Sequence, residues 1–218
     1  MRTYRFLALA AVSTAIVASP AYAEKGDVLV RVRAIVVAPN ERSGPVTPAF
    51  PGSKVGVSDS VMPEIDFTYM ATKHIGAELI LATTEHKAQG RGTLSGVPTL
   101  AKTWVLPPTL TLQYHFLPDA KIRPYVGAGI NYTIYYSTKA SDELVKAIGP
   151  TSVHMNDSVG YALQAGTDID ITKKVFLNLD VKYIGMKTTA RLNTGGAINT
   201  ARIDIDPLVF GVGLGFRL

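Results

Sequence analysis

The chain has 218 residues, of which 47% are hydrophobic and 18% charged, and its formal net charge is +5. A charge this small, without a run of basic residues, argues against nucleic acid as a partner. Cysteine is absent. Because exported soluble domains of this size often carry disulfides, that absence adds some weight to an envelope barrel closed by its own hydrogen bonds.

The first 23 residues predict a secretory signal peptide that is removed from the mature protein. Two arginines precede an apolar stretch, Phe6–Ala18, and a small-x-small cleavage site ends at Ala23. The apolar stretch is too short to span a membrane. Without residues 1–23 the chain keeps 20 Lys and Arg against 17 Asp and Glu, a formal charge of +3. We expect a signal peptide over 1–23 and one domain over 24–218.

Alternation of apolar and polar residues marks eight segments of the mature chain as strands. The clearest example is 104–136, which reads as two long strands joined by a turn that contains Pro118 and Asp119. Residues 109–116 place leucine and aromatic side chains on one face and polar side chains on the other. The eight segments are 27–37, 63–71, 75–82, 104–116, 122–136, 159–169, 175–183 and 208–218.

The connections between these segments alternate in length. Three are short turns, at 72–74, 117–121 and 171–174. Four are long, polar and broken by glycine or proline, so we expect loops at 38–60, 83–102, 137–157 and 186–202. Within the third of them, Ser141, an acidic first turn and Gly149 predict a short helix.

This alternation is typical of outer-membrane barrels, which have short periplasmic turns and long outer loops. With the N-terminus on the periplasmic side, aromatic residues gather at both expected membrane interfaces. The inner group is Phe67, Tyr69, Tyr114, Phe116, Tyr125, Phe176 and Phe216. The outer group is Trp104, Tyr132, Tyr135, Tyr136, Tyr161 and Tyr183.

The sequence therefore predicts an all-β fold, an eight-stranded antiparallel transmembrane β-barrel with short periplasmic turns and long extracellular loops. Its expected location is the cell outer membrane of a Gram-negative bacterium. A secreted lipocalin-like barrel would explain the strand count, but not the unequal connections or the apolar outer faces.

Polar side chains on the inward faces form the first group of candidate functional residues. Charges of both signs inside an eight-stranded barrel normally pair and fill it. They either plug the lumen with salt bridges or form a constriction below a cavity that opens outward, and the two interpretations are compatible. The expected lumen residues are Arg31, Arg33, Glu64, Asp66, Glu78, Gln113, His115, Gln164, Asp180 and Lys182, with Asn131, Asp168, Asn178 and Arg217 beside them.

Pro107 and Pro108 form the second candidate feature, at the outer end of the fourth strand. Neither can donate a ladder hydrogen bond, so pairing with a neighbouring strand must loosen there. The simpler interpretation is a bulge or the edge of a loop. The alternative is a defect in the barrel wall through which a hydrophobic molecule leaves sideways into lipid.

Enzymatic and metal sites find little support in the sequence. The four histidines have no metal-binding spacing. Gly211-x-Gly213-x-Gly215 resembles part of a nucleotide-binding loop, but no helix can follow it before Leu218. His154 and Ser158 are the nearest candidates for a lipid hydrolase pair, and no acid on a strand would orient them. We expect no enzyme activity and no cofactor.

Several motifs resemble the OmpW family of outer-membrane proteins. They are Leu106-Pro-Pro-Thr-Leu110 with Gln113-Tyr114, Arg123-Pro-Tyr-Val-Gly-Ala-Gly129, Phe67-Thr-Tyr-Met-Ala-Thr72, and Asp206-Pro207 with Gly215-Phe-Arg217. The resemblance covers nearly all of the mature chain. One departure is Leu218, where the family ends in an aromatic residue, and we expect it to weaken recognition by the barrel-assembly machinery without abolishing it.

The resemblance implies a hydrophobic channel for passive uptake of small apolar molecules, with release through the barrel wall into the membrane. Such a conduit bypasses lipopolysaccharide, which slows apolar solutes, and it must bind weakly enough to release them. The expected partners are outer-membrane lipids, lipopolysaccharide, small hydrophobic solutes and the assembly machinery. Trp104 joins Pro107 and Pro108 as a candidate channel or gate residue. The alternative function is a structural or surface-interaction barrel, an adhesin or receptor, with a sealed polar lumen.

Overall fold

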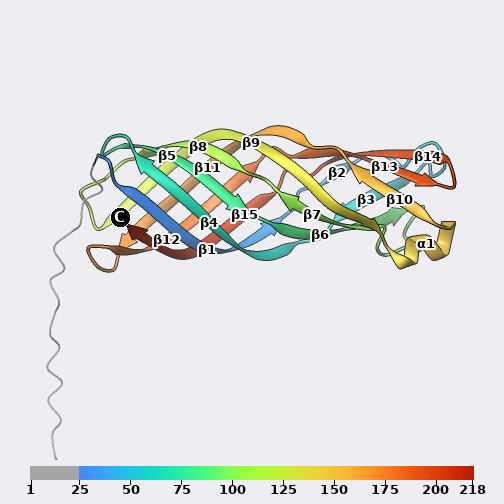
Figure 1. Ribbon diagram of the computed structural model, residues 1–218, viewed down its shortest axis with the longest axis horizontal. Coiled ribbons are helices and arrows are strands. Elements are labelled where there is room, and N and C mark those ends of the chain that lie inside the picture. Colours follow the sequence, from blue (N-terminus) through green and yellow to red (C-terminus); the bar gives the residue numbers. More distant parts are fainter. Residues whose placement is uncertain (1–24) are drawn as a thin grey trace, which may run out of the picture.

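Eight strands close into a barrel in the computed structural model, which describes residues 25–218. The predicted signal peptide, 1–23, lies outside the described residues. The first barrel strand pairs antiparallel with both the second and the last, which closes the sheet (Figure 1). The barrel strands in order are β1 (Val28–Ala38), β4 (Ser60–Met70), β5 (Ile75–Ala82), β8 (Thr109–His115), β9 (Ile122–Ala140), β11 (Ser158–Asp170), β12 (Val175–Ile184) and β15 (Leu208–Arg217). This confirms the predicted eight-stranded antiparallel barrel.

The two ends of the barrel differ in length and construction. The C-terminus and the three short connections β4–β5, β8–β9 and β11–β12 lie at one end, called the turn end below (Figure 1). The strands continue far beyond the barrel at the other, the loop end, where the only described helix is found. This helix, α1 (Asp142–Ile148), is capped by Ser141, whose side chain accepts a hydrogen bond from the Leu144 amide. The predicted helix is confirmed.

The four long connections are largely β-structure, so the prediction of loops there was wrong. They contain β2 (Arg42–Ser43), β3 (Ser53–Val57), β6 (Thr84–Gly92), β7 (Ala101–Leu106), β10 (Thr151–Met155), β13 (Lys187–Thr194) and β14 (Ala197–Asp204). Glycine and asparagine suggested loops, but they lie partly in turns: Gly195 and Gly196 both have positive φ and join β13 to β14. The strand predicted over 104–116 is likewise divided at Pro107-Pro108 into β7 and β8.

These additional strands extend the barrel at the loop end. One group continues the barrel sheet, and the other forms a separate sheet. β3, β6 and β7 pair in sequence onto the far part of β9, and β10, β13, β14 and β2 form a separate sheet. Buried side chains from both sheets share one hydrophobic core, which includes Val55, Leu100, Met155, Leu192 and Ile203. The apolar interior therefore continues well past the barrel.

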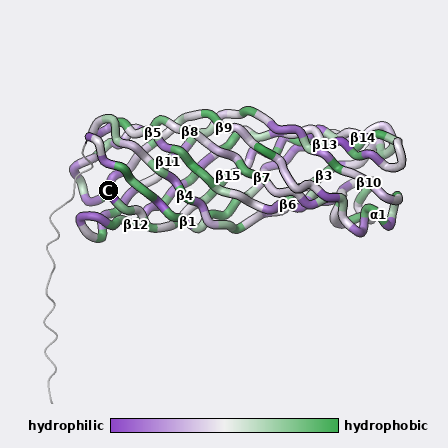
Figure 2. Tube along the Cα trace, viewed as in Figure 1, coloured by the Kyte–Doolittle hydropathy of each residue, from purple (hydrophilic) through white to green (hydrophobic). Residues whose placement is uncertain are grey.

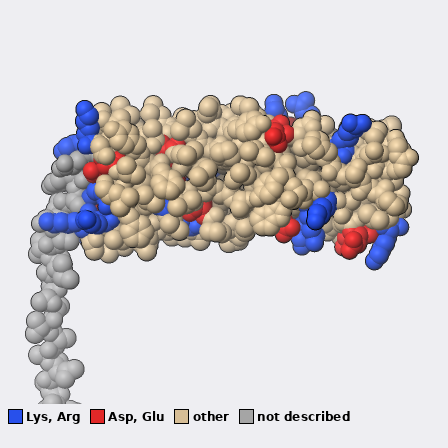
Figure 3. Space-filling model, viewed as in Figure 1, with Lys and Arg blue, Asp and Glu red and all other residues tan. Residues whose placement is uncertain are grey.

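Hydrophobic and hydrophilic residues alternate along the barrel strands (Figure 2), and burial shows that this alternation separates an apolar outer face from a polar lumen. Leu112, Ile130 and Val159 are 62%, 64% and 67% exposed, whereas the neighbouring Thr111, Asn131 and Ser158 are buried. Lysine and arginine on the visible surface lie mainly at the turn end and over the loop-end extension (Figure 3). A wide apolar band between charged ends is the surface that a bilayer covers. Among the described residues, no helix is long and apolar enough to cross a membrane.

Three aromatic residues were assigned to the membrane interfaces but lie inside the protein. Tyr125 and Phe176 are each 1% exposed and lie in the lumen, and Tyr135 is buried at the loop-end interior. The alternation of their strands explains the correction, because Tyr125 shares a face with Arg123 and Phe176 shares one with Asn178. Aromatic character alone does not distinguish a membrane girdle from a lumen residue.

The inner face of β15 carries three glycines, Gly211, Gly213 and Gly215, which make room for large side chains from other strands. A Cβ on Gly211 would contact the Arg33 side chain, and one on Gly215 would overlap the Phe176 ring. At Gly213 the obstacle is backbone, since a Cβ there would meet the Val32 carbonyl and lie 2.6 Å from Arg33 Cα. The Gly-x-Gly-x-Gly run is therefore a packing feature of the barrel.

Gly213→Ala should lower the free energy of unfolding by about 1–3 kcal/mol, because β1 and β15 must separate to admit the methyl group. Gly96→Ala is the matched control, since a Cβ at Gly96 meets no atom within 4 Å. Urea titration of the refolded protein in micelles measures both. Equal stability of the two variants would contradict the close approach of β1 and β15.

Candidate functional site

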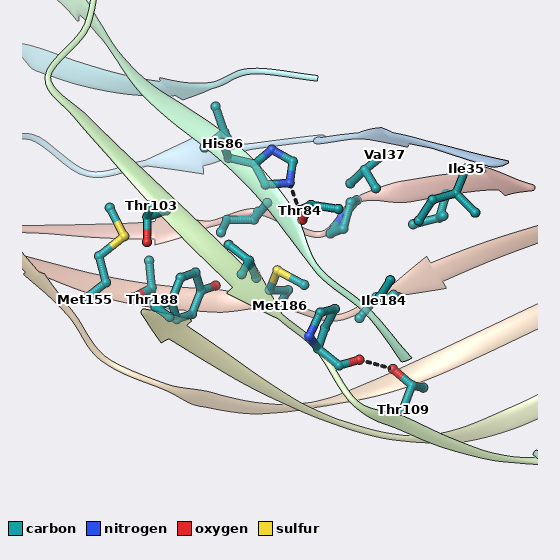
Figure 4. Close-up of a pocket in the computed structure, with 18 of the residues that line it drawn as sticks. Ile35, Val37, Thr84, His86, Thr103, Thr109, Met155, Ile184, Met186 and Thr188 are labelled. Carbon is teal, nitrogen blue, oxygen red and sulfur yellow. Dashed lines mark hydrogen bonds between the residues drawn. The ribbon is translucent and has the colours of Figure 1, made fainter. Parts of the chain in front are cut away.

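An apolar cavity occupies the interior between the barrel and its loop-end extension (Figure 4). The space between its lining atoms is about 800 Å³ when the open solvent at its mouth is included. Much of the apolar lining comes from seven strands and the connections between them. This part is Ile35, Val37, Ile80, Ala82, Val105, Met155, Ile184, Met186, Ile203, Ile205 and Val209. A cavity with this predominantly apolar lining suits a small apolar solute.

The hydroxyl groups around the cavity are already hydrogen-bonded to the wall. Thr84 Oγ1 lies 3.0 Å from His86 Nε2, and Thr109 Oγ1 donates to the Pro107 carbonyl at 2.9 Å (Figure 4). Thr188 donates to the Asn156 carbonyl at 2.8 Å, and Thr103 pairs with Thr138 at 2.7 Å. Because these polar atoms have partners, methyl groups are what the threonines offer to a solute, and the cavity is more apolar than its composition suggests.

A second apolar cavity continues from the first toward the tip of the loop end. Its lining includes Val46, Val55, Leu100, Val153 and Leu192, and it shares Ala88, Met155 and Ile203 with the first cavity. The shared residues make the lining continuous. An apolar surface therefore runs from the loop-end interior to the mouth of the barrel.

Charged residues form the floor of the cavity. Glu64 lines the cavity and pairs with Arg33 at 2.8 Å and with Lys182 at 2.9 Å. Lys182 also pairs with Asp180 at 2.6 Å, and Gln164 donates to the same carboxylate at 2.8 Å. These groups fill the lumen at the level where the apolar lining ends.

Arg31 is the centre of the network below this floor. Its guanidinium pairs with Asp66 at 3.0 Å and binds Asp168 through two nitrogens, at 3.0 and 3.2 Å. Glu78 lies 3.5 Å away. The planar group also lies over the Tyr125 ring at 5.2 Å. Bidentate pairing and ring contacts hold Arg31 in one position, so the lower lumen is filled by an ordered network.

All ten of the expected lumen residues are buried inside the barrel, and so are Asn131, Asp168 and Asn178. His115 and Gln113 join the network at its edge, through a 3.1 Å contact between His115 Nε2 and Gln113 Oε1. Arg123 was not among the predicted lumen residues, but it is fully buried beside Asp170 near the turn end. The signal was present, because Arg123 shares the inward face of β9 with Gly127 and Asn131.

The wall beside the cavity has a gap in its hydrogen-bond ladder at the two prolines. β5 and β8 pair as far as Ile80 and Thr109, and β6 and β7 resume at Thr84 and Val105. Residues 81–83 form no ladder pair with residues 106–108. This gap between the two segments is called the seam below. On its other side the ladder is kept, since the Tyr132 amide donates to the Pro108 carbonyl at 3.1 Å.

At the seam the same side chains border the cavity and reach the outer surface. Ala82 and Pro107 both line the cavity and are half-buried. The unpaired stretch covers three residues, about 10 Å along the strands. The wall there is one side chain thick, and no ladder hydrogen bonds join 81–83 to 106–108.

Trp104 is not part of the cavity lining, which corrects its assignment as a candidate channel residue. On β7 the buried positions are Ala101, Thr103 and Val105, so alternation turns Trp104 outward. Its ring lies 6.4 Å from that of Tyr136 on the outer face. Pro108 also lies outside the lining, while Pro107 belongs to it.

The enzymatic alternative has no geometric basis in the described residues. His154 is exposed on β10, and Ser158 is buried on β11, where its hydroxyl accepts from the Lys187 amide at 3.4 Å. No hydrogen bond joins His154 to Ser158 within 25–218. Residues 25–218 also contain no group of three or more His, Asp or Glu that could hold a metal ion.

His86, on the cavity wall outside the barrel proper, should make the loop end sensitive to acid. Burial lowers the pKa of His86, although its Nδ1 hydrogen-bonds the Ser58 carbonyl at 2.7 Å and Asp59 acts in the opposite direction. Below the unfolded-state pKa of about 6.5 the unfolded chain binds more protons, so stability is lost as the pH falls from there. Thermal unfolding at about pH 7.5 and 5 should show a larger decrease for the wild type than for His86→Gln. An equal decrease would contradict this role of His86.

Comparison with known proteins agrees with this architecture. The OmpW family model matches residues 24–218. Outer membrane protein W of Escherichia coli is 36% identical over 213 residues, which cover 97% of each chain. The dibenzothiophene metabolism operon protein PahQ of Pseudomonas aeruginosa is 31% identical over 168 residues, or 76% of this chain and 75% of that one.

Among solved structures, the crystal structure of the outer membrane protein OprG from Pseudomonas aeruginosa has a TM-score of 0.85 and 28% sequence identity. The match covers 91% of this chain and 99% of OprG. The family match over the whole described domain, together with the closed barrel and its apolar belt, leads to one assignment. The chain belongs to the OmpW family of non-enzymatic bacterial outer-membrane β-barrel proteins.

Proposed function

We propose that this barrel is a passive conduit for small apolar molecules, which enter at the loop end and leave sideways through the seam into the outer leaflet. The observation that carries the proposal is an apolar cavity that ends on a charged floor. An apolar solute has a continuous surface to follow inward, and it has no apolar path toward the turn end.

The charged floor argues against passage along the whole barrel axis. Arg33 contacts Glu64 at 2.8 Å and Asp66 at 2.5 Å, and its side chain is fully buried. To pass, an apolar solute would have to separate these pairs and leave the charges without partners, which costs several kcal/mol per pair. The wall at the seam has no such pairs, and opening it breaks no ladder hydrogen bond.

The relatives give additional support. PahQ is named for a dibenzothiophene metabolism operon, and dibenzothiophene is an apolar aromatic compound, the chemical class that the apolar lining of the cavity suits. No energy source is needed, since a solute moves down its own gradient from the medium into lipid.

A surface-interaction barrel remains the second candidate function, and the sealed lower lumen is the observation that favours it. A filled lumen is expected of a barrel that merely presents its outer end. The same function does not explain the apolar cavity at that outer end. Protein interiors are normally close-packed, so a cavity that serves no solute would be filled by side chains.

Solute flux into vesicles distinguishes the two functions. Refolded protein in vesicles with a lipopolysaccharide outer leaflet is mixed with iodobenzene, an apolar quencher of a membrane-embedded fluorophore, or with acrylamide, a polar quencher of a fluorophore in the lumen. The protein should speed iodobenzene quenching several-fold over protein-free vesicles and leave acrylamide quenching unchanged. No acceleration of either would favour the surface-interaction barrel, and acceleration of both would indicate a water-filled pore.

A further inference from the structure

Three lysines lie side by side on the outer face of the loop-end extension. Lys87 on β6 is directly opposite Lys102 on β7, and Lys102 is directly opposite Lys139 on β9. All three are exposed, and within the described residues none lies within ion-pair distance of a carboxylate, although Lys102 is close enough to Glu143 to help lower the pKa of that carboxyl. Like charges directly opposite one another destabilise a sheet. The arrangement is therefore one that a bound anion would stabilise.

The depth of the row places it at the membrane surface. Two residues nearer the barrel on β6 and β7, and three on β9 because the register shifts there, the same strands carry Glu85, Trp104 and Tyr136 opposite one another. Trp104 and Tyr136 belong to the aromatic residues that mark the outer interface. Two residues of strand add about 7 Å. The three ammonium groups thus lie just outside the interface, at the level of lipid headgroups.

A polar groove surrounds the lysines. Besides Lys87, Lys102 and Lys139 it is lined by Thr99, Trp104, Ser137 and by the carboxylates of Glu85, Asp142 and Glu143. The groove therefore combines cations, which bind phosphate directly, with carboxylates, which reach phosphate only through a divalent cation.

We propose that Lys87, Lys102 and Lys139 bind a phosphate group of lipid A in the surrounding lipopolysaccharide. The occupant must have an anionic headgroup at the level of the lysines and acyl chains below it, against Trp104 and Tyr136. Lipopolysaccharide is the phosphorylated lipid of the leaflet that this end of an outer-membrane barrel faces. The site is separate from the cavity, and it does not depend on whether the barrel transports anything.

Lipid retention by the refolded protein tests the site. The probes are Kdo2-lipid A, which carries two phosphates, its monophosphoryl form and phosphatidylglycerol, each in micelles with and without EDTA. Native mass spectrometry counts the lipids that remain bound. The test variant is Lys87→Gln with Lys102→Gln and Lys139→Gln. The control variant is Lys54→Gln with Lys146→Gln and Arg191→Gln, which removes the same charge from exposed positions elsewhere on the extension.

We expect the test variant to retain Kdo2-lipid A roughly fivefold less than the wild type or the control variant. Without lipid, the test variant should melt at a higher temperature than the wild type, because the repulsion is relieved, and this also verifies that it folds. Equal retention by the test and control variants would overturn the proposal. Loss of wild-type binding in EDTA would assign the site to the carboxylates, and equal retention of phosphatidylglycerol would refute selectivity for lipid A.

Discussion

Replacing Arg31 with methionine should lower the free energy of unfolding by about 3–5 kcal/mol, the largest loss expected from any single lumen substitution. Arg31 is the shared partner of Asp66, Asp168 and Glu78. Methionine keeps much of the side-chain volume and can still contact the Tyr125 ring. The loss therefore comes from three buried carboxylates that are left without their common cation.

Urea unfolding in lipid vesicles measures this loss, and Trp104, the only tryptophan of the chain, reports it by fluorescence. Arg191→Met is the control, because Arg191 is exposed on β13 and a surface charge contributes little. Adding Asp168→Asn to Arg31→Met should recover part of the loss, since one of the uncompensated charges is removed. A loss below about 1 kcal/mol for Arg31→Met would mean that the network fills the lumen without stabilising it.

The barrel and its polar lumen could be predicted from sequence because both follow from alternation with a period of two. Arg31 and Arg33 share a face of β1 with Leu29 and Ile35, and an arginine pair cannot point into lipid. The same rule would have found Arg123. It was overlooked because the residue lies close to a turn, where the alternation begins.

The cavity could not be predicted in the same way, because no single segment contains it. Its lining combines barrel residues such as Ile35 and Val209 with Thr84, Met155 and Ile203 from connections that were expected to be loops. In these connections glycine and proline interrupt the alternation, so strand signals were short. Only the pairing of β6 with β7 and of β13 with β14 turns their inner faces toward one another.

The seam was predicted in part. Two prolines in a strand imply missing donors wherever the strand lies, but sequence did not show which neighbour would be affected. The structure locates the gap between 81–83 and 106–108 and keeps the pairing with β9. It also brings Pro107 to the cavity, which sequence had no means of establishing.

A disulfide across the seam should stop iodobenzene flux almost completely if solutes leave there. The registers on either side place Ala82 opposite Pro107. Closing the seam to the spacing of an antiparallel pair, with Cα atoms about 4.5–5.5 Å apart, brings the two positions within disulfide range. The chain has no cysteine, so Ala82→Cys with Pro107→Cys forms one unambiguous pair. Quenching is measured on the reduced variant, after oxidation and again after reduction. The reduced variant is the reference, because replacing Pro107 restores a backbone N–H donor and can by itself change pairing at the seam.

The control lock is Ala77→Cys with Leu112→Cys, which joins the same two barrel strands where they are already paired and both side chains face outward. Oxidising it should leave the flux unchanged, because the disulfide joins two strands that are already hydrogen-bonded there and closes no gap in the wall. Reversible loss of flux in the seam lock alone would locate the exit between β5 and β8. Unchanged flux in both locks would contradict lateral release, because the solute would then have to cross the floor formed by Glu64, Arg33 and Lys182. In that case Arg31→Met, which loosens the network beneath that floor, should increase the flux, whereas a solute that leaves through the seam never reaches Arg31.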